Sequence, residues 1–372
     1  MSDTFSKAEW RKINNELDQN HLAYGLPPTD SQAVIIGTLN IRKLGQIDNR
    51  SGEEWDFLAR ICARFDLLAV QEIMDDMAGI KHLMSKLDSK YSLVISDATG
   101  AFPGESGNSE RLGYLYNTDV VQRSEVVSDV TYDRSKLIST LYEKLNEINA
   151  SFETYKREMD TFMMELRTTK PRLKMPVFLS FIRQPYCVAF RIGKPRATNP
   201  YTVMAVNAHL LFGDYMSDRE QEFRALMEWI IERVKQDNKT YYDDFLLLGD
   251  LNLNFDNPQT DITRISDYMK SFDAESGRSF DVNFPLLDPH PETGVVWRTN
   301  ARKSETFDQI GLFFNDERFP GHDKNSLAGK DKPLITACST LFRSLPGRYI
   351  TKRPISLRKK KQRDYTLNSN IQ

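Results

Sequence analysis

Residues that could bind cations or move protons follow a series of hydrophobic runs in this sequence. The runs at 33–37, 67–70, 201–206 and 245–248 are short and apolar, and they read as buried strands. A carboxylate or amide at the end of such a strand is costly to bury without a partner. Repetition of this arrangement therefore predicts a shared polar site at the strand ends. Its candidate members are Asn40, Gln71, Glu72, Asn207, His209, Asp250, Asn252 and Asp308.

The types of these residues suggest one kind of chemistry. Side-chain oxygens of Asn, Asp and Glu are hard ligands that suit Mg²⁺, and His is suited to proton transfer. Taken one at a time, each residue has an ordinary explanation, such as a solvated strand end or a turn. The joint pattern points to metal-assisted hydrolysis of a phosphate ester.

Length and composition limit the classes of protein. The chain has 372 residues, 40% of them hydrophobic, which is enough to form the core of one large domain or two ordinary ones. No run approaches the roughly 20 apolar residues that cross a bilayer. The start lacks a basic region followed by an apolar stretch, so we expect a cytoplasmic location. The formal net charge of −2 gives no overall basic field, so contact with nucleic acid needs a local patch.

The cysteines give no sign of a disulfide framework. Cys62, Cys187 and Cys338 are far apart and odd in number, and they do not form a metal-binding pattern. Two of them lie in apolar runs, so we expect inert packing.

The chain divides into three parts. Residues 1–32 read as a polar lead-in with a short helix at 7–20, and residues 33–323 read as one α/β domain. The tail at 324–372 loses strand-like patterning and ends in the basic run 358–363. That run is interpreted either as a solvated tail or as a nucleic-acid contact.

Strands and helices alternate within the domain. Periodic apolar residues predict helices at 53–64, 77–87 and 219–234 and a strand at 91–96. A stretch rich in Gly, Ser and Pro at 97–109 predicts a loop.

An insertion at about 134–170 interrupts this alternation. Apolar residues recur at spacings of three and four, with charges between them, which predicts a long amphipathic helix over 134–167. The favoured interpretation is a helix packed on its own domain or folded into a hairpin. The alternative is a coiled-coil seam, a surface that binds a second copy of the chain (a homodimer) or another protein. In that case the chain could be a non-catalytic interaction protein.

Seven motifs occur in an order that resembles a known family. The chain is similar to the endonuclease/exonuclease/phosphatase family over residues 33–315, apart from the insertion, and looks most like deoxyribonuclease I and its bacterial relatives. The resemblance implies an α/β fold of four layers, with two mixed sheets packed face to face, helices on both outer faces and the site at one end. The motifs are Asn40-Ile41-Arg42, Gln71-Glu72, Glu110-Arg111, Arg183-Gln184-Pro185, Asn207-Ala208-His209, Gly249-Asp250-Leu251-Asn252 and Phe307-Asp308-Gln309-Ile310.

The resemblance assigns a metal-binding side to the site. Glu72 would be the main ligand of Mg²⁺, with Mn²⁺ as a substitute, and Asn40 would lie beside the metal or the scissile phosphate. Asp250 and Asn252 would orient the attacking water and bind the phosphate, and Asp250 could also ligate the metal. Such a metal neutralises negative charge on the phosphoryl oxygens.

The resemblance also assigns an acid–base side. His209 would be a catalytic histidine held by Glu110, because a carboxylate fixes the imidazole tautomer and stabilises its charged form. Arg183 would donate to a phosphate oxygen. Asp308 would orient a second catalytic His, which the family carries in a closing Ser-Asp-His motif.

The sequence departs from the family pattern near its end. It contains no His after His322, and Thr351 and Lys352 stand where the closing Asp and His are expected. A protonated Lys has no acceptor and cannot replace a neutral imidazole. Back-translation of residues 335–342 permits a strand-like peptide in a second reading frame, so one hypothesis is that the tail is a frameshifted reading. We expect activity to be impaired in either case.

These observations lead to one expected function and two alternatives. The expected function is Mg²⁺-dependent endonuclease activity on nucleic acid, with DNA as the substrate. The first alternative is a phosphatase acting on inositol phosphates or phospholipids, because the same core serves both and specificity resides in loops. The second is the non-catalytic interaction protein that uses the 134–167 helix.

Overall fold

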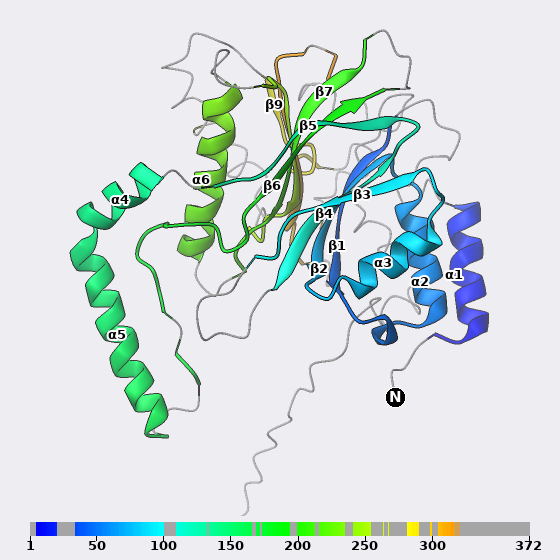
Figure 1. The fold of residues 1–372 in the computed structure, drawn as a ribbon. Coiled ribbons are helices and arrows are strands. Elements are labelled where there is room, and N and C mark those ends of the chain that lie inside the picture. The colour runs from blue at the N-terminus through cyan, green and yellow to red at the C-terminus, as the bar shows by residue number, and fades with distance from the viewer. Residues whose placement is uncertain are drawn as a thin grey trace, which may run out of the picture.

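Two mixed β-sheets form the centre of the molecule in a computed structural model (Figure 1). No helix that the structure describes is both long and apolar enough to cross a membrane. The described residues are 5–20, 34–99, 109–131, 134–165, 169–171, 173–193, 199–212, 216–234, 241–253, 263, 267, 281–289, 298–299, 304–316 and 318–319.

The first sheet has four strands in the order β1-β2-β4-β3. β1 and β2 run parallel, whereas β4 is antiparallel to both of its neighbours. Because β4 is antiparallel to β2, the first residue of β4, Glu110, lies beside the last residue of β2, Met74. The bounds are β1 Ile36–Leu44, β2 Leu67–Met74, β3 Tyr91–Ile95 and β4 Glu110–Asn117.

The second sheet has six strands in the order β5-β6-β7-β8-β10-β9. β7 and β8 are parallel, and β10 is antiparallel to β8. The bounds are β5 Val121–Asp129, β6 Tyr186–Ile192, β7 Tyr201–His209, β8 Phe245–Asp250, β9 Asp281–Asn283 and β10 Asp308–Phe314.

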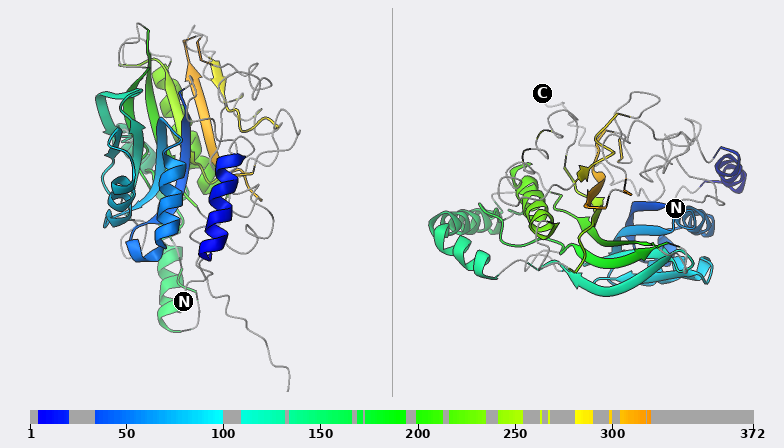
Figure 2. Two further views of the ribbon diagram at one scale, coloured as in Figure 1. Left: turned by 90° about the vertical axis from the view of Figure 1, so that its right-hand side faces the viewer. Right: turned by 90° about the horizontal axis from the view of Figure 1, so that it is seen from above.

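The two sheets stack as layers (Figures 1 and 2). The alternation of side chains along the strands explains this stacking. Along β6, Val188 and Phe190 join a core between the sheets, while Cys187 and Ala189 join a second core under helix α6. This is the period of two expected for a strand buried on both faces. The helices are α1 Lys7–Gln19, α2 Gly52–Cys62 and α3 Ala78–Lys86 on the first sheet and α6 Met216–Val234 on the second, with a short 3-10 helix η2 at Ile47–Asn49. The predicted four-layer fold class is confirmed.

The helix near the start of the chain belongs to the same core. Trp10, Ile13 and Leu17 of α1 are buried with the side chains of α2. α1 begins at a capping box in which Ser6 and Glu9 satisfy each other's backbone N–H groups. The predicted helix at 7–20 is confirmed, and it is packed into the domain rather than appended to it.

The insertion forms an arm of two helices instead of one. α4 spans Arg134–Glu143 and α5 spans Leu145–Met163, and the chain bends between them at Lys144, whose φ of −107° and ψ of 13° leave the helical region. The expectation of one continuous helix over 134–167 is therefore wrong. The amphipathic repeat passes unbroken through Lys144, so periodicity alone could not locate the bend.

The arm projects from the sandwich (Figures 1 and 2). Its base is joined to α6 by an ion pair between Lys136 and Glu232 at 3.0 Å. On α5, Ser151 donates to the carbonyl of Lys174 in the returning segment, and Ile148 is buried. Tyr142 is 84% exposed. The homodimer seam stays a prediction.

Burial makes the described cysteines inert. Cys62 and Cys187 are free and buried, and burial raises the pKa of the Cys62 thiol to about 12. Burial likewise raises the pKa of the Cys187 thiol. Cys338, the basic tail at 324–372 and the frameshift hypothesis at 335–342 lie outside the described residues.

Candidate active site at the strand ends

Strand register brings the predicted polar residues to one end of the sandwich. His209, the last residue of β7, pairs in register with Asp250, the last residue of β8. Asp250 in turn pairs with Asp308, the first residue of the antiparallel β10. In the other sheet, Asn40 pairs with Gln71, next to Glu72. Residues from five different strands thus converge at this end.

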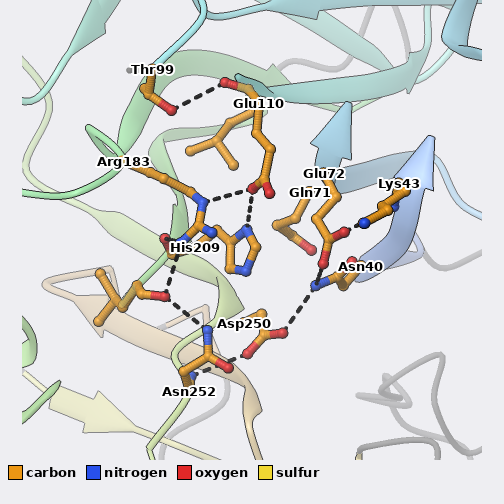
Figure 3. Close-up of polar contacts among 12 residues, drawn as sticks. Asn40, Lys43, Gln71, Glu72, Thr99, Glu110, Arg183, His209, Asp250 and Asn252 are labelled. Atoms are coloured by element: carbon orange, nitrogen blue, oxygen red, sulfur yellow. Dashed lines mark hydrogen bonds and ion pairs between the residues drawn. The ribbon is translucent and has the colours of Figure 1, made fainter. Parts of the chain in front are cut away.

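The Asn40 amide joins the two sheets at the site. Its Nδ2 donates to Oε1 of Glu72 at 3.0 Å and to Oδ2 of Asp250 at 3.0 Å (Figure 3). Glu72 lies in the first sheet and Asp250 in the second. One side chain therefore holds together two carboxylates that are far apart in the sequence.

The backbone is bent to aim these side chains. Glu72 has a φ of +58° and Asn252 a φ of +51°, values that non-glycine residues seldom adopt and that cluster at functional sites. The pairing register between β1 and β2 shifts after Asn40. Such an irregularity is typical of a β-bulge, and bulges are frequent next to active sites. The backbone N–H of Lys43 then reaches Oε2 of Glu72 at 2.8 Å.

Gly249 allows β7 and β8 to approach closely beside the site. A Cβ atom at this position would lie 1.9 Å from the carbonyl oxygen of Ala208. The residue also has a φ of +155°. Glycine is required here because no side chain fits, and Asp250 follows it directly.

A buried triad of side chains lies on the side of the site to which the resemblance assigns acid–base chemistry. Oε2 of Glu110 lies 3.1 Å from Nδ1 of His209 and accepts a hydrogen bond from Nε of Arg183 at 2.6 Å (Figure 3). Burial opposes ionisation of Glu110, but the His209 and Arg183 contacts outweigh it and hold the pKa of this carboxyl below its ordinary value. The pairing of His209 with Glu110 that the resemblance implies is present in the structure.

Arg183 makes different contacts from those predicted. Its side chain is almost fully buried, and Nη1 donates to the carbonyls of His209 and Leu210 at 3.3 Å each. Its observed partners are thus Glu110 and the backbone beside His209. Donation to a substrate phosphate stays a prediction for the remaining Nη2 group.

Asn252 is held by its neighbours. Its backbone N–H donates to Oδ1 of Asp250 at 3.1 Å, and its Nδ2 donates to the carbonyl of Leu210 at 2.8 Å. Arg219 of α6 donates to the Asn252 carbonyl at 2.7 Å. The loop after β8 is therefore fixed on three sides, and the phosphate contact assigned to Asn252 stays a prediction.

Asp308 lies against another carboxyl group. Burial and the charge of Asp250 raise the pKa of Asp308 well above its usual range, and a hydrogen bond from Thr299 opposes this rise. The backbone N–H of Asp308 also donates to Oγ1 of Thr299 at 2.8 Å. The orienting role that the resemblance gives Asp308 depends on a His in the closing motif, and the end of the chain lies outside the described residues.

Two supports of the site received no individual role from the sequence, although Gln71 and Asn207 stand in its strand-end motifs. Gln71 and Asn207 are fully buried, and Nε2 of Gln71 donates to Oδ1 of Asn207 at 2.6 Å, which links the sheets behind the site. Glu222 of α6 is 3% exposed and accepts from the N–H groups of Ile182, at 2.7 Å, and Leu211. An acidic residue on the apolar face of the predicted helix 219–234 was the available signal for Glu222.

The oxygen set at Asn40 fits a hard divalent cation. Glu72 and Asp250 provide two carboxylates, and both of them accept from the amide nitrogen of Asn40. Oδ1 of Asn40 is buried, and no described residue donates a hydrogen bond to it. Across the described ranges, no three His, Cys, Asp or Glu side chains form a metal-holding group. Two carboxylates and an amide suit Mg²⁺, which keeps several of its waters.

Comparison with known proteins supports the resemblance. A curated deoxyribonuclease from Thioalkalivibrio sp. (strain K90mix) is 27% identical over 231 residues, which cover 61% of this chain and 48% of that protein. The chain therefore spans about half the length of this relative. No family model matches the chain.

Several solved structures are also similar. An endonuclease/exonuclease/phosphatase family protein from Bacteroides thetaiotaomicron is 12% identical, with a TM-score of 0.41 and coverage of 75% of this chain and 81% of the other. The human Nocturnin catalytic domain is 13% identical, with a TM-score of 0.41 and coverage of 75% and 82%. The predicted resemblance to the endonuclease/exonuclease/phosphatase family, and to deoxyribonucleases within it, is confirmed as a similarity by the curated deoxyribonuclease.

Proposed function

We propose that this chain is a Mg²⁺-dependent phosphodiesterase that cleaves DNA internally. The observation that carries the proposal is the Asn40 bridge between Glu72 and Asp250, which lies beside the His209–Glu110 pair. A hard-oxygen set next to a tethered imidazole is the combination that phosphate-ester hydrolysis needs. The relationship to a deoxyribonuclease favours DNA over other phosphate esters.

Glu72, Asn40 and Asp250 would hold Mg²⁺, which when bound neutralises negative charge on the phosphoryl oxygens. Glu110 lies against Nδ1 of His209, and we therefore assign the proton of the neutral imidazole to Nδ1 and proton exchange to Nε2. Arg183 keeps Glu110 ionised and in place. His209 is thereby oriented to take a proton from water or to give one to the leaving oxygen.

The test compares substrate classes under metal control. The full chain is incubated with supercoiled plasmid DNA and, separately, with phosphoinositide vesicles, each with Mg²⁺ or with EDTA. We expect nicking of the plasmid in Mg²⁺ that EDTA abolishes, without phosphate release from the vesicles. Metal-dependent phosphate release without DNA cleavage would overturn the nuclease proposal in favour of the phosphatase alternative.

Matched variants separate this activity from a contaminant. His209→Asn removes the imidazole and leaves the Glu110–Arg183 ion pair in place. Asp75→Asn changes an exposed carboxylate that follows β2 outside the site. The first variant should lose nicking, and the second should keep it. Equal activity of His209→Asn and the unmodified chain would contradict the proposed role of His209.

A further inference from the structure

An exposed aromatic side chain lies next to the candidate site. Phe212 is 65% exposed and follows His209 by three residues. Its ring packs edge-on against Phe307, with centroids 6.2 Å apart and planes at 76°. Phe307 directly precedes Asp308. The aromatic pair therefore joins the two chain segments that carry His209 and Asp308.

The backbone that leads to Phe212 is fixed by several hydrogen bonds. The N–H of Leu210 donates to the Asp250 carbonyl at 3.0 Å, and the Leu210 carbonyl accepts from Asn252 at 2.8 Å. The N–H of Leu211 donates to the buried carboxylate of Glu222. The Phe212 side chain thus extends from a backbone segment that is held by hydrogen bonds. Ordering this side chain when a ligand binds therefore costs little conformational entropy.

Phe307 is held in the same way from the other side. Its carbonyl accepts from the N–H of Leu251 at 2.8 Å, in the loop between Asp250 and Asn252. The edge of one ring against the face of the other is a favoured aromatic geometry that limits rotation of Phe212. Phe212 therefore keeps a large apolar surface in water three residues after His209, while its partner Phe307 directly precedes Asp308.

A nucleobase is the ligand chemistry that such a ring suits. Every base has a flat π-face, and stacking on an aromatic side chain needs no particular sequence. The base must be unpaired or at an end, because both faces of a base inside a duplex are already stacked. An inositol phosphate offers neither a π-system nor an extended apolar face.

We propose that Phe212, oriented by Phe307, is a base-stacking residue that selects single-stranded or locally opened nucleic acid. This inference rests on the proposed phosphodiesterase function and specifies its substrate class. The stacked base positions the neighbouring phosphodiester toward His209 and the Asn40–Glu72–Asp250 group. Phe212 thereby determines specificity, and proton transfer remains with His209.

The test measures binding separately from cleavage. The probe is a fluorescent single-stranded oligothymidylate of about 12 nucleotides, a length within the span of known single-strand sites, with phosphorothioate linkages that resist cleavage. A second probe carries a tetrahydrofuran unit in place of every nucleoside, and a third is the corresponding oligouridylate. Fluorescence anisotropy in Mg²⁺ gives the dissociation constant of each probe for the full chain and for Phe212→Ala, Phe212→Tyr and Tyr142→Ala.

Phe212→Ala should weaken binding of the thymidylate and uridylate probes by at least about 5-fold, the loss expected for one stacked base. Binding of the base-free probe should not change. Phe212→Tyr keeps a ring and should retain affinity, and Tyr142→Ala removes an exposed ring on the arm and should have no effect. Weakening of only the thymidylate or only the uridylate probe would show that the sugar or the C5-methyl group of the base also contributes, with stacking upheld.

Equal binding of base-containing and base-free probes by the unmodified chain would overturn the stacking proposal. So would equal weakening of all probes by Phe212→Ala. Cleavage of an unprotected oligonucleotide in Mg²⁺ is measured in parallel. Base-dependent binding without cleavage would contradict the proposed phosphodiesterase function and leave stacking upheld, so the two failures are distinguishable.

Discussion

Oε2 of Glu110 lies 3.1 Å from Nδ1 of His209, and the same oxygen accepts from Nε of Arg183 at 2.6 Å. The two residues come from different sheets, because Glu110 begins β4 and His209 ends β7. One carboxylate therefore orients the imidazole and neutralises a buried guanidinium. Its two tasks have different experimental signatures.

Replacement of Glu110 should affect both catalysis and stability. Glu110→Gln weakens control of the His209 tautomer, so we expect kcat/KM on DNA to fall by about 10²-fold or more, the range of a positioned acid–base group. It also leaves Arg183 buried without its counter-ion, which should lower the free energy of unfolding by about 3–5 kcal/mol.

His209→Asn is the matched control for Glu110→Gln. It should lose a similar factor in kcat/KM and keep most of the stability, because the Glu110–Arg183 pair remains. Urea unfolding and steady-state kinetics of both variants and of the double variant provide the check. A double variant much less active than either single variant would show that the two residues do not act as a unit.

Glu72→Gln should weaken metal binding. The substitution removes one negative charge from the oxygen set but can still accept the Lys43 N–H that holds this side chain. We expect the Mg²⁺ concentration for half-maximal activity, and the dissociation constant from calorimetric titration, to rise by at least about 10-fold. Asp75→Asn serves as the control, since Asp75 is exposed and pairs with Arg111. Equal Mg²⁺ affinity of the two variants would remove Glu72 from the metal site.

Glu222 should make stability depend on pH. Burial raises the pKa of Glu222 from 4.5 to about 7, against the opposing effect of its two backbone hydrogen bonds and of nearby Arg183 and His209. A raised folded-state pKa means that the folded protein binds the extra proton. The stabilisation is complete below the unfolded pKa of 4.5 and is lost as pH rises through about 7.

The expected loss from Glu222 across this pH range is about 3 kcal/mol. Urea unfolding at intervals between pH 5 and pH 8 measures it, and Glu222→Gln provides the comparison because Gln does not titrate. The difference in unfolding free energy between Glu222→Gln and the unmodified chain should change across that range in favour of the variant. A constant difference would show that Glu222 titrates normally.

The Gln71–Asn207 contact should appear as a coupling energy. Asn207 also donates to the carbonyls of Val70 and Gly113, at 3.1 and 2.9 Å, so its removal leaves several buried polar groups without partners. Asn207→Leu should cost about 3 kcal/mol or more. Gln71→Leu with Asn207→Leu should cost less than the sum of the single variants, as measured in a double-mutant cycle by urea unfolding. Strict additivity would mean that the two amides act independently.

Restoration of the closing motif should increase the rate. In the family that this chain resembles, the Asp equivalent to Asp308 orients a His of the closing motif, and the 372 residues of this sequence contain no His after His322. We expect a version extended by a strand with Ser-Asp-His to cleave DNA about 10²-fold faster or more, the contribution of one positioned acid–base group. The same extension with Ser-Asp-Asn is the control. Equal rates for all three proteins would show that Asp308 needs no such partner.

The sequence by itself determined the elements that are driven by local pattern. Short apolar runs predicted β2, β7 and β8. The polar residues at the ends of these runs predicted a shared site, because such residues are costly to bury without partners. The helices expected at 7–20 and 53–64 correspond to α1 and α2, and in the structure each of them begins at a capping box. These features depend on residues a few positions apart, so they can be read without a structure.

Tertiary structure alone decided which residues, far apart in the sequence, form hydrogen bonds and ion pairs with each other. The family resemblance implied a phosphate contact for Arg183, which stays a prediction. The partners that packing gives it are Glu110, 73 residues earlier in the chain, and the carbonyls beside His209. The bend at Lys144 likewise leaves no periodic signal. The sequence marks Glu222 as an acidic residue on an apolar helix face, but it does not identify the Leu211 N–H as the partner. The physical reason is that a buried charge must find partners wherever packing brings them within about 3 Å, and sequence separation does not limit that choice.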